Sequence, residues 1–206
     1  MSFAVILSLR KASREIALFV FIVMGSHICA GALHDHSGQL PGSPKPRPVT
    51  FSLSWAGIIP GVTRDQELIK KYGKGLWLED VGHAGARAYA TSDRSILFIA
   101  ELHDNIVDSI TVASSKSLAS EIPHVETVPI VQSLPNQAKF GGVALGDRLN
   151  SVYRNLGPPS EISRSAYGGE RLTWEVSDSG AVDLAAEFGI VIKDAHVDAF
   201  VLSYGD

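Results

Sequence analysis

The stretch WAGIIPGVTRDQELIKKYG, from Trp55 to Gly73, returns in altered form as FGGVALGDRLNSVYRNLG, from Phe140 to Gly157. The turns that open the two stretches align at an offset of 85, and the glycines that end them align at 84. A later pair of segments, 107–110 and 197–200, aligns at an offset of 90. Because three anchors recur in the same order, the pattern favours two copies of one unit over two unrelated short helices.

Each copy predicts a short amphipathic helix. In the first copy, Thr63 and Gln66 have the spacing of a capping box, so a helix should begin at Arg64 and end at Gly73. In the second copy, Asp147 is the expected N-cap and glycine followed by two prolines is the expected end. The apolar residues expected to face a core are Leu68, Ile69 and Tyr72 in the first helix, and Leu149, Val152, Tyr153 and Leu156 in the second.

Strand-like runs follow both helices. They cover residues 76–81, 86–91, 95–103 and 106–113 after the first helix, and residues 171–176, 181–188 and 197–203 after the second. Since the connections between several of these runs are short, the strands should pair as antiparallel meanders. The sequence therefore predicts an α+β fold of two tandem units, each a short helix followed by an antiparallel meander.

The chain divides into five segments. They are a signal peptide at 1–32, a proline-rich tether at 33–50, a first repeat unit at 51–113, a connector at 114–139 and a second repeat unit at 140–206. Prolines favour an extended tether, and the prolines of the connector limit it to one short edge strand at 126–132. A unit of about sixty residues buries too little surface to be comfortably stable alone, so the two units should pack together.

The first 32 residues have the pattern of an export signal. Basic residues between Arg10 and Arg14 precede the apolar run Ile16 to Met24, and Ala30-Gly31-Ala32 supplies a cleavage site. The run has nine residues, whereas a membrane-spanning helix needs about twenty, which favours cleavage after Ala32 over an uncleaved anchor. We therefore expect a periplasmic or secreted protein.

Composition narrows the classes of partner. With 45% hydrophobic and 19% charged residues, the chain is typical of globular proteins. Removal of the signal takes away three basic residues and Glu15, leaving 15 Lys and Arg against 21 Asp and Glu, a net charge of −6. This excess argues against nucleic acid and anionic membranes as partners. The only cysteine, Cys29, lies in the signal, so the mature chain should contain no disulfide.

Short motifs in both copies resemble a known family. Leu145-Gly146-Asp147 and Leu156-Gly157-Pro158 in the second copy, with Pro60-Gly61-Val62-Thr63 and Tyr72-Gly73 in the first, are similar to the SmpA/BamE-like and β-lactamase-inhibitor-protein-like fold. The tandem arrangement without a lipid anchor is similar to the inhibitor branch. The resemblance implies helices that cover one face of an antiparallel sheet, with the other face free to hold a protein or peptide.

Histidines and carboxylates provide the candidate sites for chemistry. The pairs are His34 with His36, Glu101 with His103, and His124 with Glu126. The first pair flanks Asp35 and is a partial copper or zinc site, while the other two would form a zinc or acid/base site if both segments are extended. An exported metal-dependent or acid/base hydrolase is thus one alternative, and ordinary surface residues are the simpler one. No cofactor is expected, since the sequence lacks the motifs of phosphate loops, zinc proteases and serine hydrolases.

The leading expectation is a non-catalytic protein-binding module, inhibitor-like or envelope-assembly-like. Its candidate binding residues lie opposite the expected core face of the strands and are Trp77, Arg87, Tyr89, Arg171 and Glu175. Tyr, Trp and Arg are the usual anchors of protein interfaces. Trp174 is assigned to the core because it alternates in phase with aliphatic residues. The partner should be a protein or peptide of the cell envelope or exterior, and a structural envelope protein without a discrete ligand is the remaining alternative.

The signal can be tested directly. We expect protein recovered from the periplasm or medium of an expressing bacterium to begin at Leu33, with the mass of residues 33–206. Intact-mass spectrometry and N-terminal sequencing measure both. A chain that is found only in membranes, with residues 1–32 still attached, would contradict cleavage.

Overall fold

Two runs of alternating large apolar residues, 96–114 and 186–204, form the middle of one antiparallel sheet. The computed structural model describes residues 54–79, 85–119, 122, 124–165, 168–176 and 186–204. Its large sheet contains β1 (Leu76–Glu79), β2 (Gly85–Ala90), β3 (Ile96–His103), β4 (Ile106–Ser114), β7 (Glu161–Arg164), β8 (Glu170–Val176), β9 (Ala186–Lys193) and β10 (His196–Tyr204). The remaining elements are helices α2 (Asp65–Tyr72), α3 (Ser115–Leu118) and α4 (Leu149–Leu156), the 3-10 helix η2 (Val125–Thr127), and the strands β5 (Lys139–Phe140) and β6 (Val143–Ala144).

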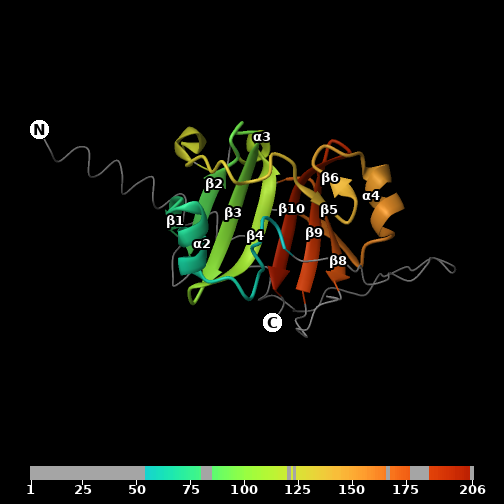
Figure 1. Ribbon diagram of the computed structural model, residues 1–206. Coiled ribbons are helices and arrows are strands. Elements are labelled where there is room, and N and C mark those ends of the chain that lie inside the picture. The colour runs from blue at the N-terminus through green and yellow to red at the C-terminus, as the bar shows by residue number, and fades with distance from the viewer. Residues whose placement is uncertain are drawn as a thin grey trace, which may run out of the picture.

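The eight strands follow the order β1-β2-β3-β4-β10-β9-β8-β7 (Figure 1). Each half of the chain forms a four-stranded meander, and the last strands of the two meanders, β4 and β10, pair with each other. We call residues 54–114 the first half and residues 139–204 the second half. The join is an antiparallel pairing of β4 with β10, in which Val112 lies opposite Phe200 and Ile110 opposite Leu202. The fold is therefore mostly β, with short helices added to one continuous sheet.

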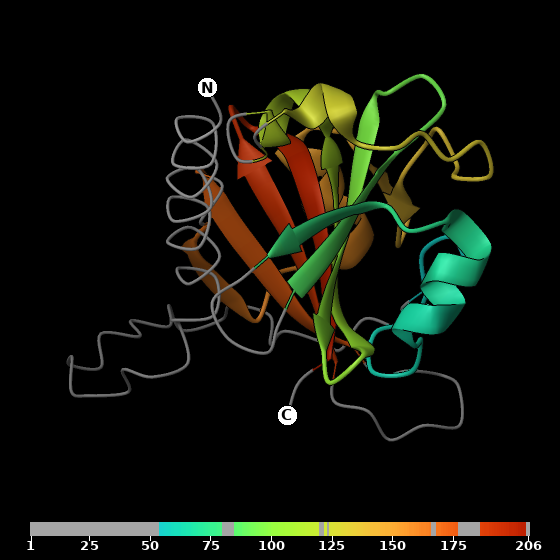
Figure 2. The same cartoon turned by 90° about the vertical axis from the view of Figure 1, so that its left-hand side faces the viewer.

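Helices α2 and α4 cover the same face of the sheet, which we call the helix face. Leu68 and Tyr72 of α2 and Val152 and Leu156 of α4 belong to one buried cluster with the aromatic residues of the strands. Figure 2 shows α2 standing to one side of the sheet. Within the described residues, no helix is long and apolar enough to cross a membrane.

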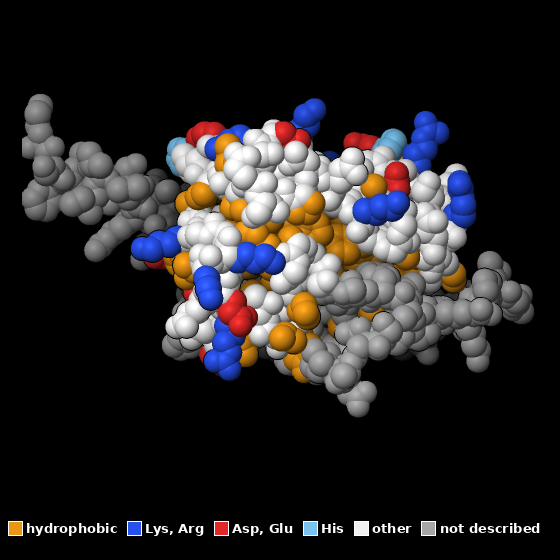
Figure 3. All heavy atoms as spheres, viewed as in Figure 1, with side chains coloured by type: hydrophobic (Ala, Val, Ile, Leu, Met, Phe, Trp, Pro, Cys, Tyr) orange, Lys and Arg blue, Asp and Glu red, His pale blue; other side chains and the backbone are white. Residues whose placement is uncertain are grey.

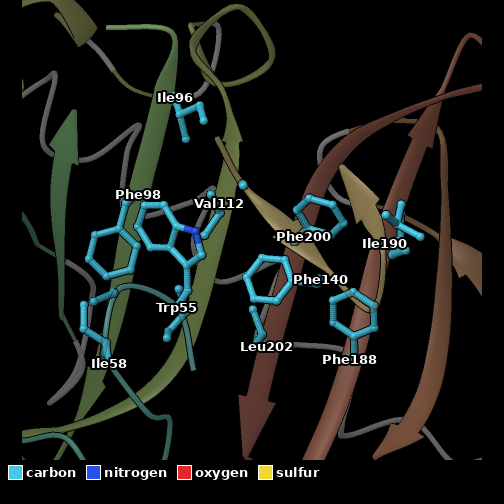
Figure 4. Close-up of a cluster of buried hydrophobic side chains, with 14 of the residues drawn as sticks. Trp55, Ile58, Ile96, Phe98, Val112, Phe140, Phe188, Ile190, Phe200 and Leu202 are labelled. Atoms are coloured by element: carbon cyan, nitrogen blue, oxygen red, sulfur yellow. The ribbon is translucent and has the colours of Figure 1, made fainter. Parts of the chain in front are cut away.

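The core of the helix face is aromatic. Phe98 stacks with Tyr89 in the first half, and Phe188 stacks with Phe200 in the second, with ring centroids 5.7 and 5.9 Å apart. Figure 4 shows Phe98 on the first-half side of this core, and Phe188 and Phe200 on the second-half side. In Figure 3, hydrophobic side chains gather in a band across the middle of this face, with charged side chains around it.

The opposite face, which we call the second face, has smaller side chains. Ala86, Ala88 and Ala90 of β2 form a cluster there with Leu97 of β3 and with Leu118 of α3. Helix α3 therefore lies on the second face, an element that the sequence did not predict.

Two tight turns place one bulky residue of each half over the strands. Trp55 and Ile58 exchange backbone hydrogen bonds of 3.1 and 2.9 Å across Ala56 and Gly57, which both have positive φ. Phe140 pairs with Val143 across two glycines of positive φ in the same way. Positive φ at both central residues is the requirement of a type I′ turn, which explains why small residues occupy these positions.

The same backbone hydrogen bonds tie both helix starts to the sheet. In the first half, Gly61 N donates to Val107 O at 2.7 Å and Val107 N donates to Thr63 O at 2.8 Å. In the second half, Gly146 N donates to Val197 O and Val197 N donates to Asp147 O, both at 2.8 Å. The two residues that bond to the strand, Gly61 and Thr63, are two positions apart in the first half, whereas Gly146 and Asp147 are adjacent in the second. Val62 is thus the additional residue that changes the sequence offset from 85 to 84.

Both predicted N-caps are wrong by one residue. Arg64 and Arg148 precede the helices, and the Arg64 backbone N–H donates to the Glu67 carboxylate at 3.0 Å. The Thr63 hydroxyl instead accepts from Ile59 N at 2.9 Å, and the Asp147 carboxylate accepts from Ala144 N at 2.9 Å. These side chains close the preceding turns, so they are not available to cap the helices.

Several strand predictions need correction. The predicted run 181–188 is displaced, because β9 spans Ala186–Lys193 and residues 181–185 lie outside the described part of the chain. Strand β7 was not predicted, since its short polar sequence lacks an apolar pattern. The expected edge strand at 126–132 is replaced by η2 and by one parallel bridge from Ile130 to Ala90.

Removing the ring of Phe200 should strongly destabilise the folded protein. Its side chain is 0% exposed and its ring lies 4.9 Å from that of Phe140. We expect Phe200→Ala to lower the free energy of unfolding by about 3–5 kcal/mol, because the ring leaves a cavity. Urea denaturation measures this, with Ile162→Ala as the control at a position 57% exposed. Equal losses in both variants would contradict the assignment of Phe200 to the core.

Candidate functional site

Strand β1 lies at one edge of the sheet and pairs, within the described residues, only with β2. Its alternation directs Trp77 and Glu79 to the helix face, while Leu76 and Leu78 pack partly against the cluster of the second face. Both residues of the helix-face pair are exposed, and Trp77 has 44% of its surface accessible. An exposed tryptophan at an open strand edge is the first feature of the site.

Trp77 is held in a fixed orientation by its neighbours on β2. The indole lies against Gly85, where an added Cβ would come within 2.2 Å of the ring, so a larger residue there would displace it. On the same strand, the Arg87 guanidinium lies over the ring at 4.8 Å from its centroid. This distance is within the range of a cation–π contact. Trp77 is therefore an ordered aromatic platform.

Arg87 is fixed in turn by helix α2. Its Nε and Nη2 donate to the two carboxylate oxygens of Asp65 at 2.5 and 2.8 Å, and Nη1 donates to Lys74 O at 2.6 Å. The side chains of Arg87 and Asp65 are only 13% and 16% exposed. The hydrogen bond to Asp65 raises the pKa of Arg87, against the lowering effect of burial, so the guanidinium stays charged. Two parallel hydrogen bonds between an arginine and a carboxylate fix the relative orientation of the two side chains.

Tyr89 does not belong to an exposed surface, so its predicted exposure is wrong. Its side chain is 0% exposed, and its hydroxyl donates to Gly73 O at 3.0 Å. The alanines of β2 suggested that the core lay on their side of the strand. Because β2 is covered on both faces, the small residues face one cluster and Tyr89 fills the larger space under α2.

Arg171 and Glu175 lie far from Trp77, on the second face of β8. Arg171 lies opposite Val191 and forms an ion pair of 3.6 Å with Glu187. Trp174, which is 1% exposed, lies in the helix-face core as predicted. Of the five predicted binding residues, the structure thus brings Trp77 and Arg87 together, with Tyr89 buried behind them.

The predicted histidine and glutamate pairs do not converge. Glu101 accepts a hydrogen bond of 2.5 Å from Ser109, and His103 stands at the β3–β4 hairpin opposite Ile106. His124 and Glu126 contact each other at 3.3 Å in the turn that leads into η2, at the other end of the sheet. No group of three or more potential metal ligands occurs in the described ranges, and His34 and His36 lie outside them.

A shallow hollow of about 410 Å³ lies between α2 and the turn that follows Trp55. Its lining includes Ile58, Glu67, Lys70 and Lys71, and neither Glu101 nor His103 contributes to it. Lys71 already donates to the carbonyl of Ala56 at 2.6 Å. The Glu101 and His103 pair proposed from the sequence therefore lies outside this hollow.

The two halves differ in the residues around Trp77. Trp77 lies opposite Arg87 on β2, and Ile162 lies opposite Leu172 on β8. The residues that start the helices also correspond: Asp65 N donates to Asn105 O, and Leu149 N donates to Ala195 O. Where the first half has tryptophan, arginine and aspartate, the second has isoleucine and two leucines.

Asp65, Lys74 and Gly85 complete the platform and were missed from the sequence. Asp65 and Arg87 are 22 residues apart, so no local pattern connects them. A signal did exist in the comparison of the two copies, since the charged Asp65 replaces the apolar Leu149 of an otherwise similar helix.

Comparisons with known proteins add little to this geometry. No protein-family model matches the chain, and no curated protein matches it. It is similar to a cysteine-rich secretory protein from Staphylococcus aureus at 10% identity and a TM-score of 0.42, over 78% of this chain and 46% of that one. It is also similar to a protein provisionally assigned as a β-lactamase inhibitor from Streptococcus mutans, at 14% identity and a TM-score of 0.25, over 76% and 90% of the two chains. The chain thus spans less than half the length of the staphylococcal protein.

The buried phenol of Tyr89 predicts a loss of stability in alkali. Burial raises its pKa to about 12, and the opposing effect of Arg87 is smaller. The unfolded chain releases this proton near pH 10, so the stabilisation is complete below pH 10 and is lost as the pH rises through 12. The unfolding free energy of wild type relative to Tyr89→Phe should fall by roughly 2 to 3 kcal/mol between pH 9 and 12. Urea denaturation at each pH measures this, and a constant difference would contradict a buried phenol.

Proposed function

We propose that this chain is an exported, non-catalytic protein-binding module whose binding surface is the β1 edge around Trp77. The observation that carries the proposal is the ordered, exposed indole. It lies on Gly85 and under Arg87, and Asp65 and Lys74 hold that arginine. We call these five residues the Trp77 platform.

The platform has the physical properties of a binding anchor. Trp and Arg are enriched among residues that dominate interface energies. A side chain that is already ordered loses little conformational freedom when a partner binds, so more of the contact energy appears as affinity. An indole that served only the core would be covered, as the 1% exposed Trp174 is.

We also propose that the scaffold is a duplicated unit. The recurring tight turns, helix-start hydrogen bonds and stacked aromatic pairs support this inference. In a duplicated scaffold, positions needed for folding keep similar chemistry in both copies. Asp65 and Arg87 correspond to leucines in the second half, and this difference supports a role for the pair outside the common fold.

Export is part of the proposal and rests on the signal-like residues 1–32, which lie outside the described part of the chain. A proline-rich segment of 18 residues, 33–50, would then separate the mature N-terminus from the folded domain. The partner would be a polypeptide of the envelope or exterior.

Site-specific photocrosslinking tests the binding surface in cells of the source organism. A photoreactive phenylalanine at Glu79 is exposed on the same strand and leaves Trp77 in place. Matched probes at Ile162 and Glu175 report on the opposite edge and on the second face. We expect a protein adduct at position 79 that Trp77→Ala abolishes.

The control probes make the outcome decisive. Mass spectrometry of the adducts identifies the crosslinked protein at each position. An adduct at 175 alone would move the site to the second face and contradict the β1 edge. Absence of adducts at all three positions, with the protein folded and exported, would contradict a binding module.

A further inference from the structure

We propose that the partner binds as an extended segment that adds an antiparallel strand to β1, with an aromatic side chain on Trp77 and a cationic side chain opposite Glu79. The inference rests on the proposed function and specifies the partner of that site. It assigns the recognition chemistry to two exposed side chains and to the backbone of one edge strand.

The backbone of β1 offers hydrogen bonds in the required direction. In an antiparallel ladder, alternate residues direct their N–H and C=O groups to one neighbour and the intervening residues direct theirs to the other side. Within the described residues, β1 has a ladder partner on the β2 side only. An extended peptide can satisfy the outward groups, which is the mode of strand addition.

The two edge strands of the sheet, β1 and β7, differ in how apolar they are. Natural proteins protect open edges with charged residues, and β7 has charges at both ends, Glu161 and Arg164. Strand β1 instead has the sequence Leu-Trp-Leu-Glu, with three large apolar residues in a row. In the described part of the chain no strand covers this apolar edge, and such an edge can accept a partner strand.

Side chains on the helix face define the register of the added strand. Residues directly opposite each other in an antiparallel pair have Cβ atoms about 4.5–5.5 Å apart, so each added side chain meets one residue of β1. Trp77 and Glu79 are two residues apart on the same face and both are exposed. A partner segment with aromatic and basic residues two apart therefore matches both positions at once.

Charge favours a cationic segment. Glu79 has no ion-pair partner among the residues that the structure describes, whereas the nearby Arg87 is neutralised by Asp65. The chain as a whole has a formal net charge of −4, which also attracts a basic peptide. A lysine opposite Glu79 would form a cross-strand ion pair of the kind that stabilises sheets.

The probe for the test is a labelled synthetic peptide, acetyl-Thr-Lys-Val-Phe-Val-Thr-amide. In antiparallel register its lysine faces Glu79, its phenylalanine faces Trp77 and its valines face Leu76 and Leu78. Fluorescence anisotropy with the mature protein measures the dissociation constant. We expect Trp77→Ala to weaken binding at least tenfold and Glu79→Gln to weaken it severalfold. The matched edge control, Ile162→Ala, should leave it unchanged.

A second peptide separates strand addition from side-chain docking. It has the same side chains, but its lysine and phenylalanine nitrogens are methylated, which removes the backbone donors that lie opposite Glu79 and Trp77. We expect it to bind at least tenfold more weakly. Amide hydrogen exchange of Trp77 and Glu79, whose backbone groups point away from β2, should slow when the unmodified peptide is added. Equal binding of the two peptides, or unchanged exchange, would overturn strand addition.

The failures of the two proposals are distinguishable. If the Trp77-dependent crosslink at position 79 forms but neither peptide binds through β1, strand addition by a basic-aromatic segment is wrong and the binding edge survives. If the crosslinked protein is a second copy of this chain, the partner class is wrong. If no Trp77-dependent adduct forms, the site itself is wrong.

Discussion

The pairing of β4 with β10 is the constraint on which the rest of the structure depends. Each half alone is a four-stranded meander with a short helix, and its last strand would present an open apolar edge that includes Val112 or Phe200. Pairing these two strands turns both edges into the centre of one sheet. The aromatic groups of the two halves then belong to one buried cluster, and burial of their large side chains stabilises the fold.

This join also determines which strands remain at the edges. Because the last strands of both halves lie in the middle, the first strands, β1 and β7, must lie at the two ends of the sheet. A helix precedes each of them on the same face, and α2 lies against this edge of the sheet. Asp65 at the start of α2 and Lys74 just after its end both reach Arg87, and the site at Trp77 is a consequence of the topology.

Much of the fold follows from local sequence patterns, and the errors have identifiable physical causes. The offsets of 85, 84 and 90 located both helices, because tight turns and helix ends need glycine at defined positions. The N-caps were displaced since Thr63 and Asp147 close turns that depend on contacts with Val107 and Val197. Strand β7 was missed because an edge strand with one apolar residue has no alternating signal.

The candidate site was only half predictable, and the reason bears on how the two halves of this chain should be compared. Alternation placed Trp77 and Arg87 on one surface, but it also placed Tyr89 there, since alternation cannot show that β2 is buried on both faces. The ion pair that orders Arg87 joins residues that are distant in the sequence. Comparing equivalent positions of the two halves removes this ambiguity. Tyr89 corresponds to the buried Trp174, and each packs on the phenylalanine opposite it in the ladder, whereas Arg87 corresponds to a leucine. The aromatic pairs that both halves contain are therefore explained by the core, whereas the Arg87–Asp65 pair, which only the first half contains, is the part of the site that we propose serves binding.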